Sequence, residues 1–245
     1  YFDENILINK YHMNILKSSA IYSFFTFLSR IFGFLRDILI ANFLGAGFLA
    51  DIFFVAFRFP NTFRRIFSEG ALNSAFVPIY SKLVLEKEKS ESGIFAGNII
   101  SILTFSTLLI VILVEIFMPY FLQLIAPGFV GDEEKFLKLV NVSRITFPFL
   151  VFISVSSICS SILNANEKFA LSASLPIILN ITLCLSLIFA YYLSNRFLEF
   201  LSWGVLIAGI IQVIFLFFSI KSNKIVVLFT QKISSSVKGF FNLFF

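Results

Sequence analysis

The chain has 245 residues, of which 58% are hydrophobic and 13% are charged, and 36 of them are phenylalanine. With a mean hydropathy of +0.94, this composition excludes an ordinary water-soluble domain and indicates an integral membrane protein. The net charge of +5 invites a nucleic-acid interpretation, but the lysines lie mostly between apolar runs, where membrane topology explains them better. We therefore expect membrane lipids around the chain and no nucleic acid as a partner.

Six apolar runs are each long enough to cross a bilayer core of about 30 Å at about 1.5 Å per residue. This pattern predicts an all-α polytopic membrane protein with six transmembrane helices. The predicted spans are residues 15–43, 48–84, 94–126, 136–163, 171–193 and 198–220. Around them we expect a polar N-terminal extension over residues 1–12, a six-helix lobe over residues 13–222 and a cytoplasmic linker over residues 223–245.

The second span, residues 48–84, is too long for one straight helix across the membrane. Pro60 and the stretch SEGALNS, residues 68–74, provide places where this span can kink or break. Broken helices are typical of the binding sites of transporters.

Lysine and arginine are distributed unequally between alternate connections. If the N-terminus is cytoplasmic, the outer connections hold Lys135, Lys138 and Arg196. The inner segments then hold Lys10, Lys17, Lys82, Lys87, Lys89, Lys168, Lys221, Lys224, Lys232 and Lys238. Because cytoplasmic loops carry an excess of positive charge, we expect both ends of this segment to lie in the cytoplasm.

Charged residues lie within the first two spans, among neighbours apolar enough to be embedded in the membrane. They are Arg30, Arg36, Asp37, Asp51, Arg58, Arg64, Arg65 and Glu69. At roughly 2.5 to 3.5 kcal/mol for a charge at the bilayer centre, Arg30, Arg36 and Asp37 together could cost about 8 to 10 kcal/mol. We therefore expect these groups to face a wet cavity or one another instead of lipid. A polar cavity inside an apolar protein suggests a transport pathway.

Helical spacing places these side chains on shared faces. The faces are Ser29 with Arg36, Arg30 with Asp37, Asp51 with Arg58 and Arg65, and Asn61 with Arg64 and Ser68. Arginine offers a planar fork of donors that suits phosphate oxygens, so excess arginine favours an anionic ligand such as a phosphate or pyrophosphate. The alternative is that each arginine pairs with an acid or reaches a lipid headgroup, and it stays open for Arg58, Arg64 and Arg65.

Sequence patterns for catalysis are missing, so we expect a transporter and not an enzyme. The chain holds one histidine, His12, before the first span, and it shows no HExxH, GxSxG, CxxC or P-loop pattern. Cys159 and Cys184 lie inside apolar runs without a metal or redox spacing, so we expect no catalytic residue, metal site or cofactor. A cation-coupled drug antiporter is the rival transporter, but its cavity should carry acids for cations, and here arginines dominate.

Two adjacent runs carry a family resemblance. They are MNILKSSAIYSFFTFLSRIFGFLRDILIANFLGAG, from Met13, and ADIFFVAFRFPNTFRRIFSEGALNSAFVPIY, from Ala50. Further matches are APGF, ITFPFL, ILNANEKF and LPIILNIT, at residues 126–129, 145–150, 162–169 and 175–182. Over residues 13 to about 220 the chain resembles the MurJ (MviN) lipid II flippase family of the multidrug/oligosaccharidyl-lipid/polysaccharide exporter superfamily.

The resemblance implies a bacterial inner-membrane transporter. It would flip lipid II, the lipid-linked peptidoglycan precursor, from the cytoplasmic to the periplasmic leaflet by alternating access. Another polyprenyl-linked oligosaccharide is the alternative cargo. The resemblance also implies a MATE-like fold of two six-helix lobes plus two further helices. Because this chain stops after its sixth predicted span, we expect the C-terminal lobe in the same gene product or in a second half-chain.

The resemblance also implies a cationic central cavity. The implied residues are Arg30, Arg36, Arg64, Ser29 and Asn61 for substrate binding, Asp37, Asp51 and Glu69 as cavity carboxylates or ion-pair partners, and Arg58 and Arg65 as supporting basic residues. A pyrophosphate lipid with a bulky sugar-peptide head fits the excess of arginine that the sequence shows.

Overall fold

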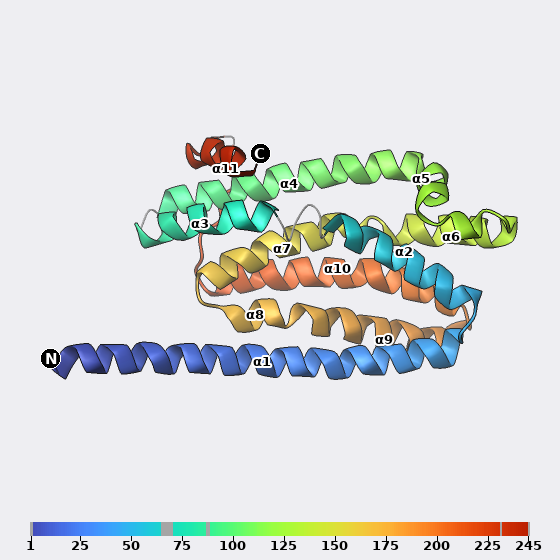
Figure 1. Ribbon diagram of the computed structural model, residues 1–245, viewed down its shortest axis with the longest axis horizontal. Coiled ribbons are helices and arrows are strands. Elements are labelled where there is room, and N and C mark those ends of the chain that lie inside the picture. Colours follow the sequence, from blue (N-terminus) through green and yellow to red (C-terminus); the bar gives the residue numbers. More distant parts are fainter. Residues whose placement is uncertain (1, 65–70, 87–88, 231, 245) are drawn as a thin grey trace.

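The computed structural model describes residues 2–64, 71–86, 89–230 and 232–244, and it is built of helices (Figure 1). Within these ranges the chain forms no strand, which confirms the prediction of an all-α protein. In chain order the elements are α1 (Phe2–Leu44), α2 (Phe48–Arg64), α3 (Ala71–Leu85), α4 (Lys89–Ile116), α5 (Met118–Ile125), the short 3-10 helix η2 (Pro127–Phe129), α6 (Glu133–Thr146), α7 (Phe149–Ala165), α8 (Phe169–Ala173), α9 (Leu175–Leu193), α10 (Phe197–Ser222) and α11 (Ser236–Phe244). Helix α1 already includes Phe2, so the expected polar extension continues the first helix from that residue.

Among the described residues, four helical segments are long and apolar enough to cross a membrane: Lys89–Ile116, Glu133–Ala165, Phe169–Leu193 and Phe197–Ser222. They correspond to the third through sixth predicted spans. The first predicted span lies on α1, and the second is divided between α2 and α3. Their crossing of the membrane, and with it the count of six, stays a prediction.

The third predicted span extends too far toward its C-terminus. Helix α4 ends at Ile116, and α5 turns away from its axis (Figure 1), whereas the prediction continued the span to residue 126. The reason is Pro119, which lies in the first turn of α5 and has no N–H to continue the hydrogen bonds of α4. After η2, α6 begins behind Asp132, whose carboxylate accepts a hydrogen bond from the backbone N–H of Lys135 at 3.1 Å. That hydrogen bond lowers the pKa of Asp132.

The long helices form a layered bundle in which α1 lies along α9, α9 packs on α10, α10 on α7, and α7 on α4 (Figure 1). Helix α2 packs across α6, α7 and α10. Aromatic rings fill these contacts, since Phe59 of α2 stacks on Phe147 with ring centroids 4.6 Å apart. Another cluster joins Ile40 of α1, Phe53 of α2 and Leu183 of α9. This packing holds α1, α2 and α9 together at the place where the candidate site lies.

Pro60 does not break α2, which continues through it to Arg64. A proline inside a helix leaves the carbonyl four residues earlier without its N–H donor, and here that carbonyl belongs to Ala56. The hydroxyl of Thr146, from α6, donates to the Ala56 oxygen at 3.1 Å. In an apolar interior such a replacement donor removes most of the cost of the missing backbone bond. Of the stretch where a break was expected, residues 71–74 belong to α3, and residues 68–70 lie outside the described residues, so that break stays a prediction.

The segment after α10 returns across the bundle to α4. Helix α11 then packs on α3 and α4 (Figure 1). The backbone N–H of Leu228 donates to the Gly93 carbonyl at 2.9 Å. The Asn98 side chain accepts from the backbone N–H of Ser234 at 2.9 Å and donates to the Lys232 carbonyl at 3.2 Å. A Cβ at Gly97 would overlap the carbonyl of Leu228, so glycine is needed for this close approach. The expected linker thus contacts α4 through Leu228, Lys232 and Ser234. That it leads to a C-terminal lobe stays a prediction.

The replacement bond to Ala56 gives a stability prediction. Thr146→Val keeps the shape of the buried side chain but leaves the Ala56 carbonyl unpaired. We expect it to lower the free energy of unfolding by about 1 to 3 kcal/mol, measured by denaturation of the purified protein in detergent. The matched control is Thr107→Val, because the buried Thr107 hydroxyl donates to the carbonyl of Leu103 within its own helix. Equal stability of the two variants would show that Thr146 does not compensate for Pro60.

Candidate functional site

The candidate site is a recess of about 250 Å³ between α1, α2 and α9. Its lining residues are Arg36, Ile40, Phe53, Phe54, Phe57, Arg58, Asn61 and Leu183. Three of them, Arg36, Arg58 and Asn61, are residues that the sequence predicted for the site. The other lining residues are aliphatic or aromatic, so the recess combines guanidinium groups with apolar walls.

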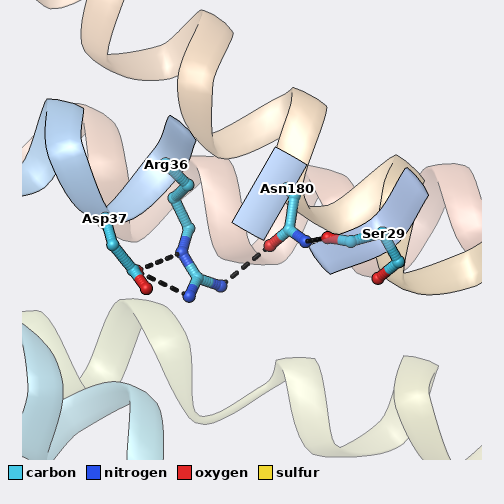
Figure 2. A network of polar contacts seen from close by, with 4 residues as sticks. All are labelled: Ser29, Arg36, Asp37 and Asn180. Carbon is cyan, nitrogen blue, oxygen red and sulfur yellow. Dashed lines mark hydrogen bonds and ion pairs between the residues drawn. The ribbon is translucent and has the colours of Figure 1, made fainter. Parts of the chain in front are cut away.

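Arg36 is held from two sides (Figure 2). Its Nε and Nη2 donate to Oδ1 of Asp37 at 3.0 and 2.7 Å, and its Nη1 donates to Oδ1 of Asn180 at 2.8 Å. The Arg36 side chain is 21% exposed and the Asp37 side chain 56% exposed. The ion pair is therefore open to solvent on the carboxylate side, while the guanidinium is mostly enclosed. A ligand can approach from the Asp37 side without displacing Asn180.

Asn180 is a site residue that sequence patterns did not single out. Its side chain is buried in α9, and its Nδ2 donates to the backbone carbonyl of Ser29 in α1 at 3.1 Å. That contact orients the amide so that Oδ1 points to Arg36 (Figure 2). A Cβ at Gly33 would lie 3.3 Å from Asn180 Nδ2, so glycine leaves room for the amide against α1. The available sequence signal was a carboxamide inside an otherwise apolar helix, where polar side chains are rare.

Arg58 and Asn61 bring α2 into the same recess. The Asn61 amide donates to the Phe57 carbonyl at 2.8 Å, one turn earlier in α2. Arg58 is exposed, and no described carboxylate forms an ion pair with it. Within the described part of the chain Asp37 offsets the charge of Arg36 and no carboxylate offsets that of Arg58, so the described lining of the recess carries net positive charge. The expected sharing of a helical face by Asp51 and Arg58 therefore does not produce an ion pair between them.

The other predicted site residues lie elsewhere or outside the described part of the chain. Arg30 is exposed on α1 and does not line the recess. Asp51 is exposed in the first turn of α2. The Ser29 side chain lines a different recess, described below. The side chain of Arg64 and the whole of Arg65 and Glu69 lie outside the described residues, so their roles stay predictions.

The chemistry available to the recess is the binding of an anion. Guanidinium groups donate charge-assisted hydrogen bonds, which are stronger where apolar walls lower the local dielectric constant. Over the described residues, no group of three or more His, Cys, Asp or Glu side chains is placed to hold a metal ion. Cys159 and Cys184 are both buried free thiols. Among the described lining residues, the arginines are the groups that could bind an anion.

Comparison with known proteins identifies relatives of this chain. A family model described as lipid II flippase MurJ matches residues 40–245. A probable lipid II flippase MurJ of Rickettsia prowazekii is 40% identical over 210 residues, which are 85% of this chain and 41% of that protein. The lipid II flippase MurJ of Burkholderia cenocepacia is 31% identical over 200 residues, which are 82% of this chain and 39% of that protein.

A solved structure gives the same relationship. The lipid II flippase MurJ in an inward closed conformation aligns with a TM-score of 0.68 at 31% sequence identity. The alignment covers 92% of this chain and 46% of that structure. The chain thus spans about two fifths of the length of the curated relatives that it matches.

The contact between Asn180 and Arg36 gives a test of how the guanidinium is held. In Asn180→Ala the Nη1 bond is lost, and we expect Arg36 to react about tenfold faster with an arginine-selective dicarbonyl reagent, as one charge-assisted hydrogen bond implies. Labelling is followed by peptide mass spectrometry on protein in nanodiscs. Asn166→Ala is the control, because that amide donates to Tyr80 and Ile162 instead. An unchanged rate at Arg36 in Asn180→Ala would contradict the anchoring role.

Proposed function

The chain belongs to the lipid II flippase MurJ family, and we propose that it forms the N-terminal lobe of a transporter that moves the lipid-linked peptidoglycan precursor across the bacterial cytoplasmic membrane. Family membership confirms the resemblance that the sequence motifs indicate. The names of the relatives support lipid II as the cargo. The observation in this chain that carries the proposal is the recess in which Arg36 and Arg58 lie within an apolar helical body.

The diphosphate of such a lipid matches the recess in charge and in hydrogen bonding. Arg36 has more N–H donors than its contacts with Asp37 and Asn180 use, so donors remain for phosphate oxygens. Arg58 adds a second charge from the facing helix. The apolar walls lower the local dielectric constant around the mostly enclosed Arg36 guanidinium and so strengthen its interaction with phosphate. We therefore assign the diphosphate to this recess, with Asn61 as a further polar contact.

Asp37 gives a route for loading and release. Its carboxylate occupies the Nε and Nη2 donors of Arg36 and is itself more than half exposed. An incoming phosphate offers the same bidentate geometry with more charge, so it can displace the carboxylate. When the phosphate leaves, Asp37 re-forms the ion pair and prevents an unpaired guanidinium in the membrane. In this mechanism Arg36 is paired at both stages of the cycle.

The orientation that we propose has both ends of this segment in the cytoplasm. In Figure 1 the start of α1, the end of α3, the start of α4, the connection α7–α8 and the end of α10 lie at one end of the bundle. The connections α5–α6 and α9–α10 lie at the other end. The lysine-rich segments coincide with the first end, as expected for a cytoplasmic side. Substrate would then enter the recess from the end that carries the start of α1.

Transport by alternating access needs a second lobe opposite this one. Transporters of this kind place the binding site between structural repeats that rock against each other. We propose that the second lobe is supplied by the same gene product or by a second half-chain. The diphosphate and its head group would cross between the lobes, while the prenyl tail stays in lipid.

A cation-coupled drug antiporter is the rival transporter, and the recess disfavours it. A cation site needs carboxylates, but the charged groups that line the recess in the described part of the chain are both arginines. We accordingly assign transport of an anionic lipid and no chemical reaction to the chain.

The role of Arg36 can be tested in cells whose own flippase is depleted and which express the gene containing this sequence. The wild type should restore exposure of lipid II on the outer face of the membrane. Arg36→Ala should reduce that exposure by about tenfold or more, because it removes the charge that binds the diphosphate. The control is Arg196→Ala, which removes an exposed arginine that pairs with Glu199 outside the recess.

Three outcomes separate the parts of the proposal. Full exposure in Arg36→Ala, at equal protein levels in the membrane, would contradict the role of Arg36. Failure of the wild type to restore exposure, although it reaches the membrane, would contradict lipid II as the cargo. Loss of exposure in Arg196→Ala as well would show that the assay reports any lost surface charge.

A further inference from the structure

A second recess of about 270 Å³ lies between α1, α7, α8 and α9. Its lining residues are Tyr22, Thr26, Ser29, Ser160, Asn164, Ser172, Ala173 and Pro176. It shares no lining residue with the recess around Arg36 and Arg58, which we call the arginine recess, although α1 and α9 contribute to both. We call it the hydroxyl recess.

The polar groups of the hydroxyl recess are all uncharged. Tyr22, Thr26, Ser29, Ser160 and Ser172 contribute hydroxyl groups, and Asn164 contributes a carboxamide. Hydroxyls and carboxamides both donate and accept hydrogen bonds, which matches the hydroxyl and amide groups of sugars. An ionised phosphate offers acceptors and no donors, and it favours cationic partners. This lining supplies no cationic side chain. The two recesses therefore suit different parts of a ligand.

Some of these groups already have partners within the protein, whereas the buried Ser160 hydroxyl has none among the described residues. The Thr26 hydroxyl donates to the Tyr22 carbonyl at 2.9 Å, and the Ser172 hydroxyl donates to Asn164 Oδ1. Because Ser160 also lines the recess, its unpaired hydroxyl is available to a ligand that binds there, where a hydrogen bond would remove the cost of burying it.

A chain of hydrogen bonds through Ser29 and Asn180 links the linings of the two recesses. The Ser29 side chain lines the hydroxyl recess, and its backbone carbonyl accepts from Asn180, which also binds Arg36 (Figure 2). Ser29 and Arg36 are seven residues apart, or about 10 Å along α1 at about 1.5 Å per residue. A ligand bound by its diphosphate at Arg36 would therefore bring the sugar attached to that diphosphate toward Ser29.

We propose that the hydroxyl recess is a subsite for the sugar attached directly to the diphosphate of the lipid-linked substrate. The assignment rests on the proposed function, because it takes the arginine recess as the diphosphate site. Ser29 and Ser160 donate to or accept from sugar hydroxyl or amide groups, and Asn164 with Ser172 borders the same space. The hydroxyl recess thus selects glycosylated lipids over the bare prenyl diphosphate.

The test measures binding of two probes to the complete gene product in nanodiscs. One probe is a prenyl diphosphate without sugar, and the other is the same lipid carrying a disaccharide. Wild type should bind the glycosylated probe more tightly. The double variant Ser29→Ala, Ser160→Ala should lose about tenfold in affinity for the glycosylated probe and retain its affinity for the sugar-free one. Ser219→Ala is the control, because its buried hydroxyl donates within α10, outside both recesses.

The outcomes distinguish failure of this inference from failure of the proposed function. Equal binding of both probes by wild type would overturn the sugar subsite while leaving the diphosphate site in place. Equal weakening of both probes in the double variant would show that the serines act only on the structure. If the double variant does not fold, Ser160→Ala alone removes the unpartnered hydroxyl of the same recess, and a selective loss of affinity for the glycosylated probe is again expected. Failure of wild type to bind either probe would contradict the proposed function itself.

Discussion

The hydrogen bonds of the Asn180 carboxamide are the contact on which the site depends. One end of the amide binds the Ser29 backbone in α1, and the other end binds the Arg36 guanidinium. Gly33 provides the space that lets α9 bring the amide this close to α1. Without this contact Arg36 would keep only Asp37, which is largely exposed and can rotate away with its partner. The position of the guanidinium in the recess is thus set by packing between two helices.

Elsewhere in this apolar bundle, too, polar groups are satisfied by hydrogen bonds or ion pairs with other groups of the protein. Asp37 and Asn180 compensate Arg36, and Thr146 supplies the donor that Pro60 removes from the Ala56 carbonyl. Each of these contacts lowers the cost of a polar group that lipid and apolar side chains cannot satisfy. Six buried side-chain atoms have no partner among the described residues, and one of them, the Ser160 hydroxyl, lies beside the hydroxyl recess. That hydroxyl is therefore available to a ligand bound in the recess.

The sequence predicted the all-α class and the four apolar spans from α4 to α10, because apolar length is a local property. It also named Arg36, Arg58 and Asn61 as candidate site residues, and the structure places these three around one recess. It missed the early end of α4 because the effect of Pro119 was hidden within one continuous apolar run. It also missed Asn180 and the docking of Leu228 on Gly93. These contacts join residues far apart in the chain, and no local pattern specifies which helices meet.

The central claim is that the arginine recess binds the diphosphate of a lipid. The most direct measurement is equilibrium binding of a prenyl diphosphate and of the matching prenyl alcohol to the complete gene product in nanodiscs, with wild type and an Arg36→Gln, Arg58→Gln variant. The account predicts that wild type binds the diphosphate at least about tenfold more tightly than the alcohol, and that the variant loses this preference. Equal preference in wild type and variant would contradict it.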